Sequence, residues 1–279
     1  MTNTANEIHP TAKGYHNVET TNNYLKGRPT LPLETIDYIR NNIKLTADSK
    51  ILDLAAGTGK FTQLLADHGG FNDIIAVEPS PEFRDACTQV LTAIQKEQPN
   101  RSDLKFQVLD GTATSIPMPD ESVDALFVSQ AFHWFSNEES LREMIRVLKR
   151  GAPLILVWCD MDVSNPIVRD AAAIFHEKYY DGVTPQFRSY KWKSAFENES
   201  LSNIIDTDLH LERFRFDQKY TRDTLINRIL SVSYVSLFSD EKKKQLIAEV
   251  DEALAKHPET INSSFNYPYN VELYYTFKK

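Results

Sequence analysis

The run ILDLAAGTGKFT at residues 51–62 constrains the fold of this chain more than any other stretch. Its apolar start is typical of the end of a buried strand. Gly57 and Gly59 follow, and a helix-like run begins at Lys60. Because glycine has no Cβ, a strand that enters a helix through such a turn lets the backbone approach a ligand closely. The run therefore predicts a ligand-binding turn at the end of a strand.

A second strand-like run ends in an acid. IIAVE, residues 74–78, is apolar up to Glu78, which lies nineteen residues beyond Gly59. An acid at the tip of the second strand can accept two hydrogen bonds from a ribose diol. The turn and the acid together indicate a cofactor that carries a nucleoside.

The details of the turn narrow the choice of cofactor. A dinucleotide fingerprint requires a third glycine where this chain has Thr62, and a phosphate-binding P-loop requires a glycine where it has Leu54. Asp53 stands just before the turn, and a carboxylate there suits a ligand with an ammonium group and no phosphate. S-adenosylmethionine, which combines an amino acid with an adenosine, meets these conditions. A dinucleotide-dependent oxidoreductase remains as an alternative.

Strands and helices alternate along the first part of the chain. The predicted strands are residues 50–55, 73–78, 104–109, 123–129 and 153–159, and the predicted helices are 33–43, 60–67, 81–97 and 137–149. Such alternation favours a doubly wound parallel sheet. Beyond residue 159 we expect helical stretches near 165–180, 200–206, 222–237 and 240–256, a strand at 210–220 and a closing strand at 271–277. The closing strand is expected to lie antiparallel beside 210–220.

Bulk composition excludes several classes of protein. The 279 residues are 41% hydrophobic and 25% charged, which is ordinary for a soluble globular chain. The net charge of −8 argues against non-specific nucleic-acid binding, which needs a basic face. Two cysteines in different elements indicate a reducing compartment, and no signal peptide or membrane span is recognisable. We therefore expect a cytoplasmic protein with no metal, nucleic-acid or membrane partner; its oligomeric state stays open.

Several motifs together resemble one family. ILDLAAGTGKFT, the acid in AVEPS, LDGTATSIPMPDESVDALFVSQAFHWF and RVLKRGAPLILVW are similar, in order and spacing, to the motifs of class I S-adenosylmethionine-dependent methyltransferases. The resemblance implies a Rossmann-like α/β fold: a doubly wound, mostly parallel sheet of seven strands, with an antiparallel last strand and a helical cap. YLKGRPTLP at 24–32 and QAFHWF at 130–135 further resemble the fungal and microbial branch that includes trans-aconitate methyltransferase and the cantharidin-resistance methyltransferase.

The resemblance also implies a division of the chain. It predicts a single methyltransferase domain over residues 1–279. Residues 1–45 would cover the cofactor and 46–160 would form the cofactor-binding core. Residues 161–207 would form a substrate cap, and 208–279 would complete the sheet.

Cofactor contacts are carried over from the family motifs. Asp53, Ala55 and Gly57 would bind the methionine moiety, with Gly59 in the same turn, and Glu78 would bind the ribose. Ala55 replaces the glycine common in the family, so we expect crowding there. The remaining implied contacts are Asp110 to the adenine amino group, Thr112 and Ala113 beside it, Gln130 near the transferred methyl group, and Tyr24 from the covering segment.

Candidates for catalysis and acceptor binding have two interpretations each. His133 could be a general base, or it could be fixed by packing between Phe132 and Trp134. Trp134 could stabilise a sulfonium or belong to the core. The basic and aromatic run that contains Arg188, Lys191 and Trp192 could bind an anionic acceptor or form a solvated face. Gln130 is the second residue that we place at the reacting centre.

These observations predict a methyltransferase that acts on a small molecule. We expect O-methylation of a carboxylate, because a carboxylate is already ionised at neutral pH and the chain shows no compelling catalytic dyad. Methylation of a phenol or alcohol, with His133 as base, is one alternative. Methylation of a macromolecule is another, although SQAF stands where an amino-group motif would be. A non-catalytic cofactor-binding or scaffolding protein is the alternative from another class.

Overall fold

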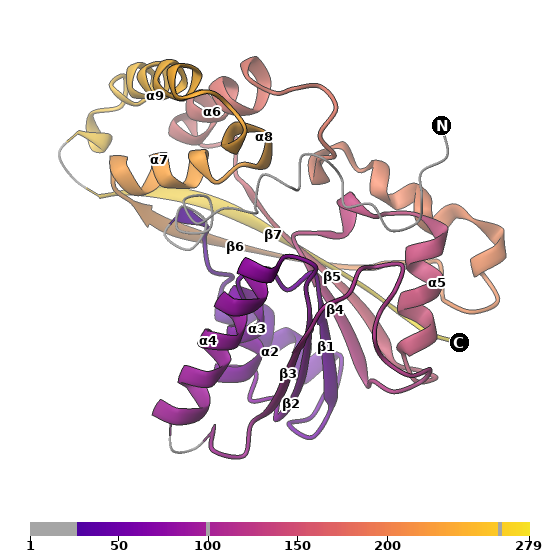
Figure 1. The fold of residues 1–279 in the computed structure, drawn as a ribbon. Coiled ribbons are helices and arrows are strands. Elements are labelled where there is room, and N and C mark those ends of the chain that lie inside the picture. The colour runs from indigo at the N-terminus through magenta and orange to yellow at the C-terminus, as the bar shows by residue number, and fades with distance from the viewer. Residues whose placement is uncertain (1–26, 99–100, 262–263) are drawn as a thin grey trace.

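One seven-stranded sheet organises the protein (Figure 1). The computed structural model describes residues 27–98, 101–261 and 264–279. The sheet has the order β3-β2-β1-β4-β5-β7-β6. Its strands are β1 (Lys50–Leu54), β2 (Asp73–Val77), β3 (Lys105–Leu109), β4 (Ala125–Ser129), β5 (Pro153–Met161), β6 (His210–Tyr220) and β7 (Phe265–Phe277).

Only β7 runs against its neighbours. It pairs antiparallel with both β5 and β6, whereas the ladders among β1 to β5 are parallel. From β1 the chain moves outward to β3 and then returns to pair β4 with the other side of β1. The gap between the carboxyl ends of β1 and β4 is thus the switch point at which open α/β sheets bind ligands.

Alternate residues of the strands form two cores, one on each face of the sheet. Ile51, Ile74 and Phe127 pack on one face with helices α2 (Leu33–Asn42), α3 (Lys60–Asp67) and α4 (Pro81–Glu97). Leu52, Ile75 and their neighbours pack on the other face with α5 (Glu138–Val147) and the short helical turns between 191 and 201. Burial on both faces explains why the strands are apolar runs with little alternation.

A third core lies around the extended ends of β5, β6 and β7. Tyr267 and Tyr269 of β7 and Phe175 are buried there. The surrounding helices gather at one end of the sheet in Figure 1. They are α6 (Pro166–Ala172), the π-helical turn Ala173–Lys178, α7 (Arg222–Leu230), α8 (Ser233–Ser236) and α9 (Asp240–Leu254).

The predicted fold is confirmed, with corrections in the second half. Helices 60–67 and 81–97, strand 210–220 and its antiparallel partner match the structure. The expected helix at 200–206 is wrong, because only a 3-10 turn forms at Glu199–Leu201. The helical run 222–237 is interrupted between α7 and α8, and 165–180 divides into α6 and the π-helical turn. The closing strand starts at Phe265, earlier than expected. It includes Pro268, a residue that usually marks a strand edge.

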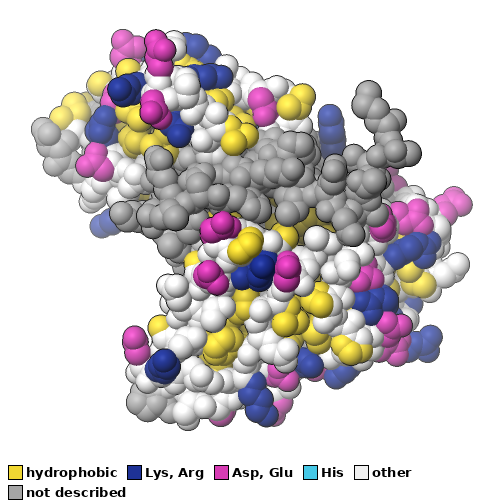
Figure 2. Space-filling view, in the orientation of Figure 1, with side chains coloured by type: hydrophobic (Ala, Val, Ile, Leu, Met, Phe, Trp, Pro, Cys, Tyr) yellow, Lys and Arg dark blue, Asp and Glu magenta, His cyan; other side chains and the backbone are white. Residues whose placement is uncertain are grey.

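Membrane-spanning helices and basic surface areas were each sought among the described residues. No helix among the described residues is long and apolar enough to cross a bilayer. On the face shown in Figure 2, Lys and Arg side chains are interspersed with Asp and Glu. This face gives no support to a nucleic-acid substrate.

Candidate cofactor and acceptor site

The glycine turn holds three residues in the left-handed region. Ala55 has φ 57°, Gly57 59° and Gly59 82°. A Cβ added to Gly59 would lie 2.9 Å from Cys87 Sγ and 3.0 Å from Cys87 Cα, so α4 leaves no room for a side chain there. Ala55 adopts its positive φ at a cost of about 1–2 kcal/mol, and its position lines the pocket described below. The turn is therefore a strained, closely packed element at the switch point.

Asp53, at the end of β1, has one unpaired oxygen. The side chain is fully buried, and Thr62 Oγ1 donates to its Oδ2 at 2.6 Å. Oδ1 has no hydrogen-bond partner among the described residues. Burial raises the pKa of Asp53 to about 7; the negative charge of Glu78 adds to the rise, and the Thr62 hydrogen bond opposes it. An ammonium group placed at Oδ1 would satisfy this oxygen and favour its ionised form.

Glu78, just beyond β2, is fixed against the turn. Its Oε2 accepts the Gly57 N–H at 2.9 Å and its Oε1 accepts the Ser80 N–H at 2.9 Å. Burial raises the pKa of this carboxyl, and the two backbone hydrogen bonds oppose the rise. Each carboxylate oxygen keeps a further lone pair, so a diol can still be bound. The acid therefore connects the turn to the tip of the second strand.

The loop after β3 holds the residues predicted at the adenine. Asp110 is largely exposed and accepts from Arg84 Nη1 at 2.9 Å. Thr112 pairs with Ser115 across a backbone bridge, and Ala113 is buried in the core. An adenine amino group at Asp110 would share that carboxylate with Arg84.

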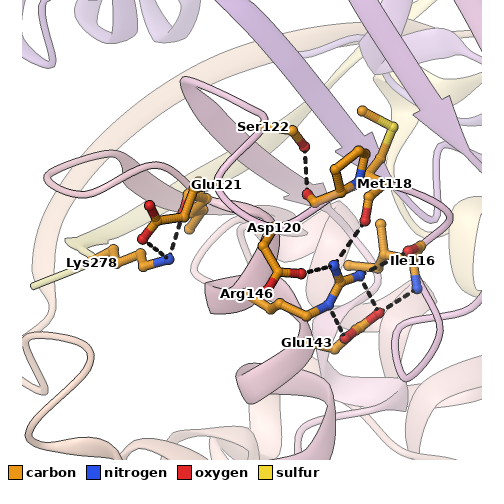
Figure 3. Close-up of polar contacts among 10 residues, drawn as sticks. Ile116, Met118, Asp120, Glu121, Ser122, Glu143, Arg146 and Lys278 are labelled. Atoms are coloured by element: carbon orange, nitrogen blue, oxygen red, sulfur yellow. Dashed lines mark hydrogen bonds and ion pairs between the residues drawn. The ribbon is translucent and has the colours of Figure 1, made fainter.

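Arg146 of α5 anchors the continuation of this loop, as Figure 3 shows. It donates to the carbonyl oxygens of Met118 at 2.8 Å and Ile116 at 3.0 Å. It also forms ion pairs with Asp120 at 2.6 Å and Glu143 at 2.7 Å. The Glu143–Arg146 spacing is a helix-surface pair in the sequence, but nothing in the sequence indicates that it holds a distant loop.

A pocket opens at the glycine turn, and two groups of residues form its walls. The first wall is Asp53, the 55–58 turn and Lys60, and the second wall is residues 28–31 and Arg228. Ser129, Gln130 and Cys159 complete it at the ends of β4 and β5. Gln130 has φ 63° and its Nε2 donates to the Cys159 carbonyl at 3.2 Å. Gln130 is thus, after Ala55, a second pocket residue with a strained backbone conformation.

His133 makes a hydrogen bond that bears on its two interpretations. Trp158 Nε1 donates to His133 Nδ1 at 3.1 Å, so the neutral ring carries its proton on Nε2. Burial, with a smaller effect from Arg28, lowers the pKa of His133 to about 3. With the Nδ1 lone pair engaged, the ring has no free acceptor nitrogen for a proton from the substrate. The geometry favours a fixed, packed histidine over a general base.

The residues predicted to bind the acceptor have different surroundings. Trp192 is buried in an aromatic cluster, 4.5 Å from the Trp158 ring and 4.9 Å from the Tyr274 ring. Arg188 donates to Asp160 Oδ1 at 2.6 Å, and Lys191 is exposed. Trp134 is half-buried, with its ring 5.5 Å from that of His133. Tyr24 lies outside the described residues.

The pocket residues that sequence reasoning missed include Lys60, Cys159 and Arg228. Lys60 lies directly after the glycine turn, so the motif could have indicated that it lines the pocket. Burial, with a further effect from Arg28, lowers the pKa of Lys60 to about 8. Arg228 lies on α7, which carries no recognised motif, so the sequence gave no indication that this residue lines the pocket.

The geometry defines a class of protein. A glycine turn after β1, a buried acid with a free oxygen and an acid at the tip of β2 form the binding site of an α/β protein for a cofactor with an amino acid and a nucleoside. Asp53 Oδ1 fits an ammonium group and Glu78 fits a ribose. These residues therefore fit S-adenosylmethionine.

Comparisons with known proteins identify the family. The sequence profile described as "Methyltransferase domain" matches residues 52–156. An uncharacterized methyltransferase-like protein of Schizosaccharomyces pombe is 33% identical over 241 residues, which are 86% of each chain. The chain belongs to the class I S-adenosylmethionine-dependent methyltransferases, and it is an enzyme of that type.

Solved structures share the fold. A protein of Anaeromyxobacter dehalogenans, provisionally named a type II methyltransferase, superimposes with a TM-score of 0.63 at 17% identity, over 89% of this chain and 97% of that chain. A Haemonchus contortus phosphoethanolamine N-methyltransferase, solved with phosphomonomethylethanolamine and S-adenosylhomocysteine, superimposes with a TM-score of 0.53 at 13% identity. That superposition covers 98% of this chain and 60% of the other.

Proposed function

We propose that this methyltransferase esterifies a carboxylate of a small organic acid. The observation that carries the proposal is the charge of the pocket. Among the described residues, three basic side chains line it, Arg28, Lys60 and Arg228, against the one carboxyl of Asp53. A pocket of this charge attracts an anionic acceptor and holds it by charge-assisted hydrogen bonds.

The same pocket is poorly equipped to remove a proton. Burial raises the pKa of the Cys159 thiol, which keeps it protonated near neutrality. Lys60, with a pKa of about 8, donates to the Arg28 carbonyl oxygen at 2.5 Å. His133 lacks a free acceptor nitrogen, as described above. An acceptor that is already ionised needs none of these groups, since a carboxylic acid with an ordinary pKa of about 4 is deprotonated at neutral pH.

The protein would contribute alignment, exclusion of water and electrostatics. S-adenosylmethionine supplies the electrophilic methyl group. The turn and Asp53 would hold the methionine end, Glu78 the ribose, and Asp110 with Thr112 and Ala113 the adenine. Gln130, fixed by the Cys159 carbonyl, would border the reacting atoms. Methylation removes the charge of the acceptor, so the basic pocket would release the ester more readily than it binds the acid.

The finer assignments extend this proposal. The division into a covering segment, a core, a cap and C-terminal strands agrees with two walls contributed by different parts of the chain. The YLKGRPTLP and QAFHWF motifs support the branch of trans-aconitate methyltransferase. The two free cysteines support a reducing compartment such as the cytoplasm.

A methyl-transfer assay tests the acceptor class. Purified enzyme and radiolabelled S-adenosylmethionine would be incubated with trans-aconitate, succinate, benzoate, a phenol and phosphomonomethylethanolamine. We expect label only in the carboxylates, in a product that mild base hydrolyses, as it does an ester. Turnover confined to the phenol or the amine would contradict the proposal. In the control reactions each acid is replaced by its amide, which carries no negative charge.

A further inference from the structure

Arg228 is a buried cation that the described structure leaves incompletely paired. The side chain is 5% exposed, and its Nε and Nη1 have no hydrogen-bond partner among the described residues. One hydrogen bond joins the guanidinium to Tyr269. The residue lines the pocket together with Gln130 and Cys159. Its unpaired donors therefore belong to a guanidinium that borders the reaction site.

No carboxylate of the described structure compensates this charge. Asp160, at the end of β5, is held by Arg188 at 2.6 Å. Asp53, the single acid among the described residues that line the pocket, lies on β1. A buried, unpaired charge costs several kcal/mol, so such an arrangement persists where a ligand supplies the counter-charge.

Arg228 is also held rigidly. Gly27 packs directly on its backbone, where an added Cβ would lie 2.3 Å from the Arg228 nitrogen. Tyr220 OH donates to the Gly27 carbonyl at 2.7 Å and lies 3.2 Å from Tyr269 OH. One turn along the chain, Ser231 accepts Arg28 Nε at 3.0 Å. The guanidinium is thus preorganised, which reduces the entropy lost when it binds an anion.

We infer that Arg228 holds a carboxylate of the methyl acceptor and selects for it. This inference rests on the proposed function and names the residue that would give it specificity. A guanidinium offers five N–H donors in one plane, and a carboxylate is the acceptor that such a group binds well.

The position of Arg228 favours the acceptor over the cofactor as the source of this carboxylate. Asp53 is on β1, whereas Cys159 is on β5, lines the pocket with Arg228 and lies close enough to feel its charge. In the order β1-β4-β5 these strands are two steps apart, or about 10 Å. The ammonium and carboxylate of methionine share one carbon, so an ammonium at Asp53 keeps the methionine carboxylate near β1. Lys60 follows the β1 turn directly and lines the pocket, so a basic side chain is already present for the methionine carboxylate.

The test uses the full-length enzyme and two variants, Arg228→Met and Arg228→Lys. S-adenosylhomocysteine binding is measured by calorimetry. Succinate, trans-aconitate and benzoate are then titrated into the S-adenosylhomocysteine complex, with succinamide as the uncharged probe. We expect Arg228→Met to bind S-adenosylhomocysteine within about threefold of the wild type and to bind the acids at least about thirtyfold more weakly. Arg228→Lys should restore part of that loss, because it keeps the charge and loses the planar donors.

Thermal unfolding separates this role from a structural one. Methionine removes an incompletely paired buried charge, so the melting temperature of Arg228→Met should equal or exceed that of the wild type. A lower melting temperature with unchanged acid affinity would contradict the inference. An equal loss of S-adenosylhomocysteine binding would assign Arg228 to the cofactor and overturn it, and so would failure of all three acids to bind the wild-type complex.

The inference and the proposed function fail separately. If acids bind through Arg228 but no ester is formed, the proposed carboxylate methylation is wrong and the anion site stands. If esters form and Arg228→Met leaves KM for the acid unchanged, the function stands and the role of Arg228 is wrong.

Discussion

The two walls of the pocket are built in different ways. The wall that faces the methionine end is a single run from Asp53 to Phe61, fixed by short connections such as Thr62 to Asp53 and Gly57 to Glu78. In the second wall Arg28 donates to Ser231, which is 203 residues away in the chain. The first wall is thus held by contacts between residues close in the sequence, whereas the second depends on the C-terminal helices.

This difference suggests a division of labour. The local wall would bind the invariant methyl donor, and the long-range wall would bind the acceptor. The second wall can therefore change its chemistry through substitutions on α7 without disturbing the glycine turn. Four predictions test this comparison, in order of decreasing expected effect.

The largest effect is expected from Trp192→Ala, in the segment that we propose as the substrate cap. Trp192 packs against Trp158, Tyr274 and Phe132 and is 1% exposed. Loss of this side chain should lower the free energy of unfolding by about 3–5 kcal/mol, measured in urea. Trp192→Phe should cost less, because it keeps a ring and removes an indole N–H that has no partner among the described residues.

The matched control is Lys191→Ala, at an exposed neighbour, with an expected change within about 0.5 kcal/mol. If Trp192→Ala kept full stability and raised KM for the acceptor, Trp192 would be a substrate contact, as the sequence first suggested.

The second effect lies within the local wall. In Gly59→Ala the new Cβ would lie 2.9–3.0 Å from Cys87 atoms, and the residue would keep a φ of 82°. Because both the close contact and the positive φ are unfavourable, we expect the free energy of unfolding to fall by about 2–4 kcal/mol. In Gly57→Ala the nearest atom is 3.9 Å away, and only the backbone strain of about 1–2 kcal/mol remains. Urea unfolding of both variants compares them; equal losses would show that the packing of the turn on α4 contributes nothing.

The third effect concerns the pH dependence of cofactor affinity. The pKa of Asp53, about 7 in the free protein, is raised above its unfolded value. The free enzyme should therefore lose stability as the pH rises through about 4 to 7. An ammonium ligand needs the ionised form, so S-adenosylhomocysteine affinity should rise about tenfold from about pH 5.5 to about pH 7.

Asp53→Asn provides the comparison. It should bind S-adenosylhomocysteine more weakly at neutral pH, with little pH dependence over the same range, and its free form should be more stable than the wild type at about pH 8. Calorimetry at several pH values checks the affinity. A wild-type affinity that is flat with pH would contradict the assigned contact.

The smallest effect is expected from Ser231→Ala, in the long-range wall. It removes the side-chain acceptor of Arg28 Nε but leaves the Ser231 carbonyl, which accepts Arg28 Nη2 at 2.9 Å. The free energy of unfolding should fall by about 0.5–1.5 kcal/mol. The KM for the acceptor should change more than the affinity for S-adenosylhomocysteine. The reverse ranking would place this contact on the cofactor side.

The outcome of the sequence predictions follows the same division. The strands and helices of residues 50–159 and the positions of Asp53, Gly57 and Glu78 were recognisable, because hydrophobic patterns and turn residues are local signals. The expected helix at 200–206 and the start of the last strand were wrong, because pairing with β6 and packing on the sheet decide those segments. The solvated or substrate-binding run at 188–193 proved to include a core residue, Trp192.

The sequence by itself determined the parallel α/β core, the glycine turn and the identity of the methyl donor, since each can be recognised from hydrophobic patterns and motifs that are local in the sequence. Tertiary structure decided that His133 accepts from Trp158, that Trp192 is buried, and that Arg228 lines the same pocket as Asp53. A guanidinium on a helix has no local signature of its environment. Only the fold, by burying it without a full set of partners, makes it a candidate for binding an anion.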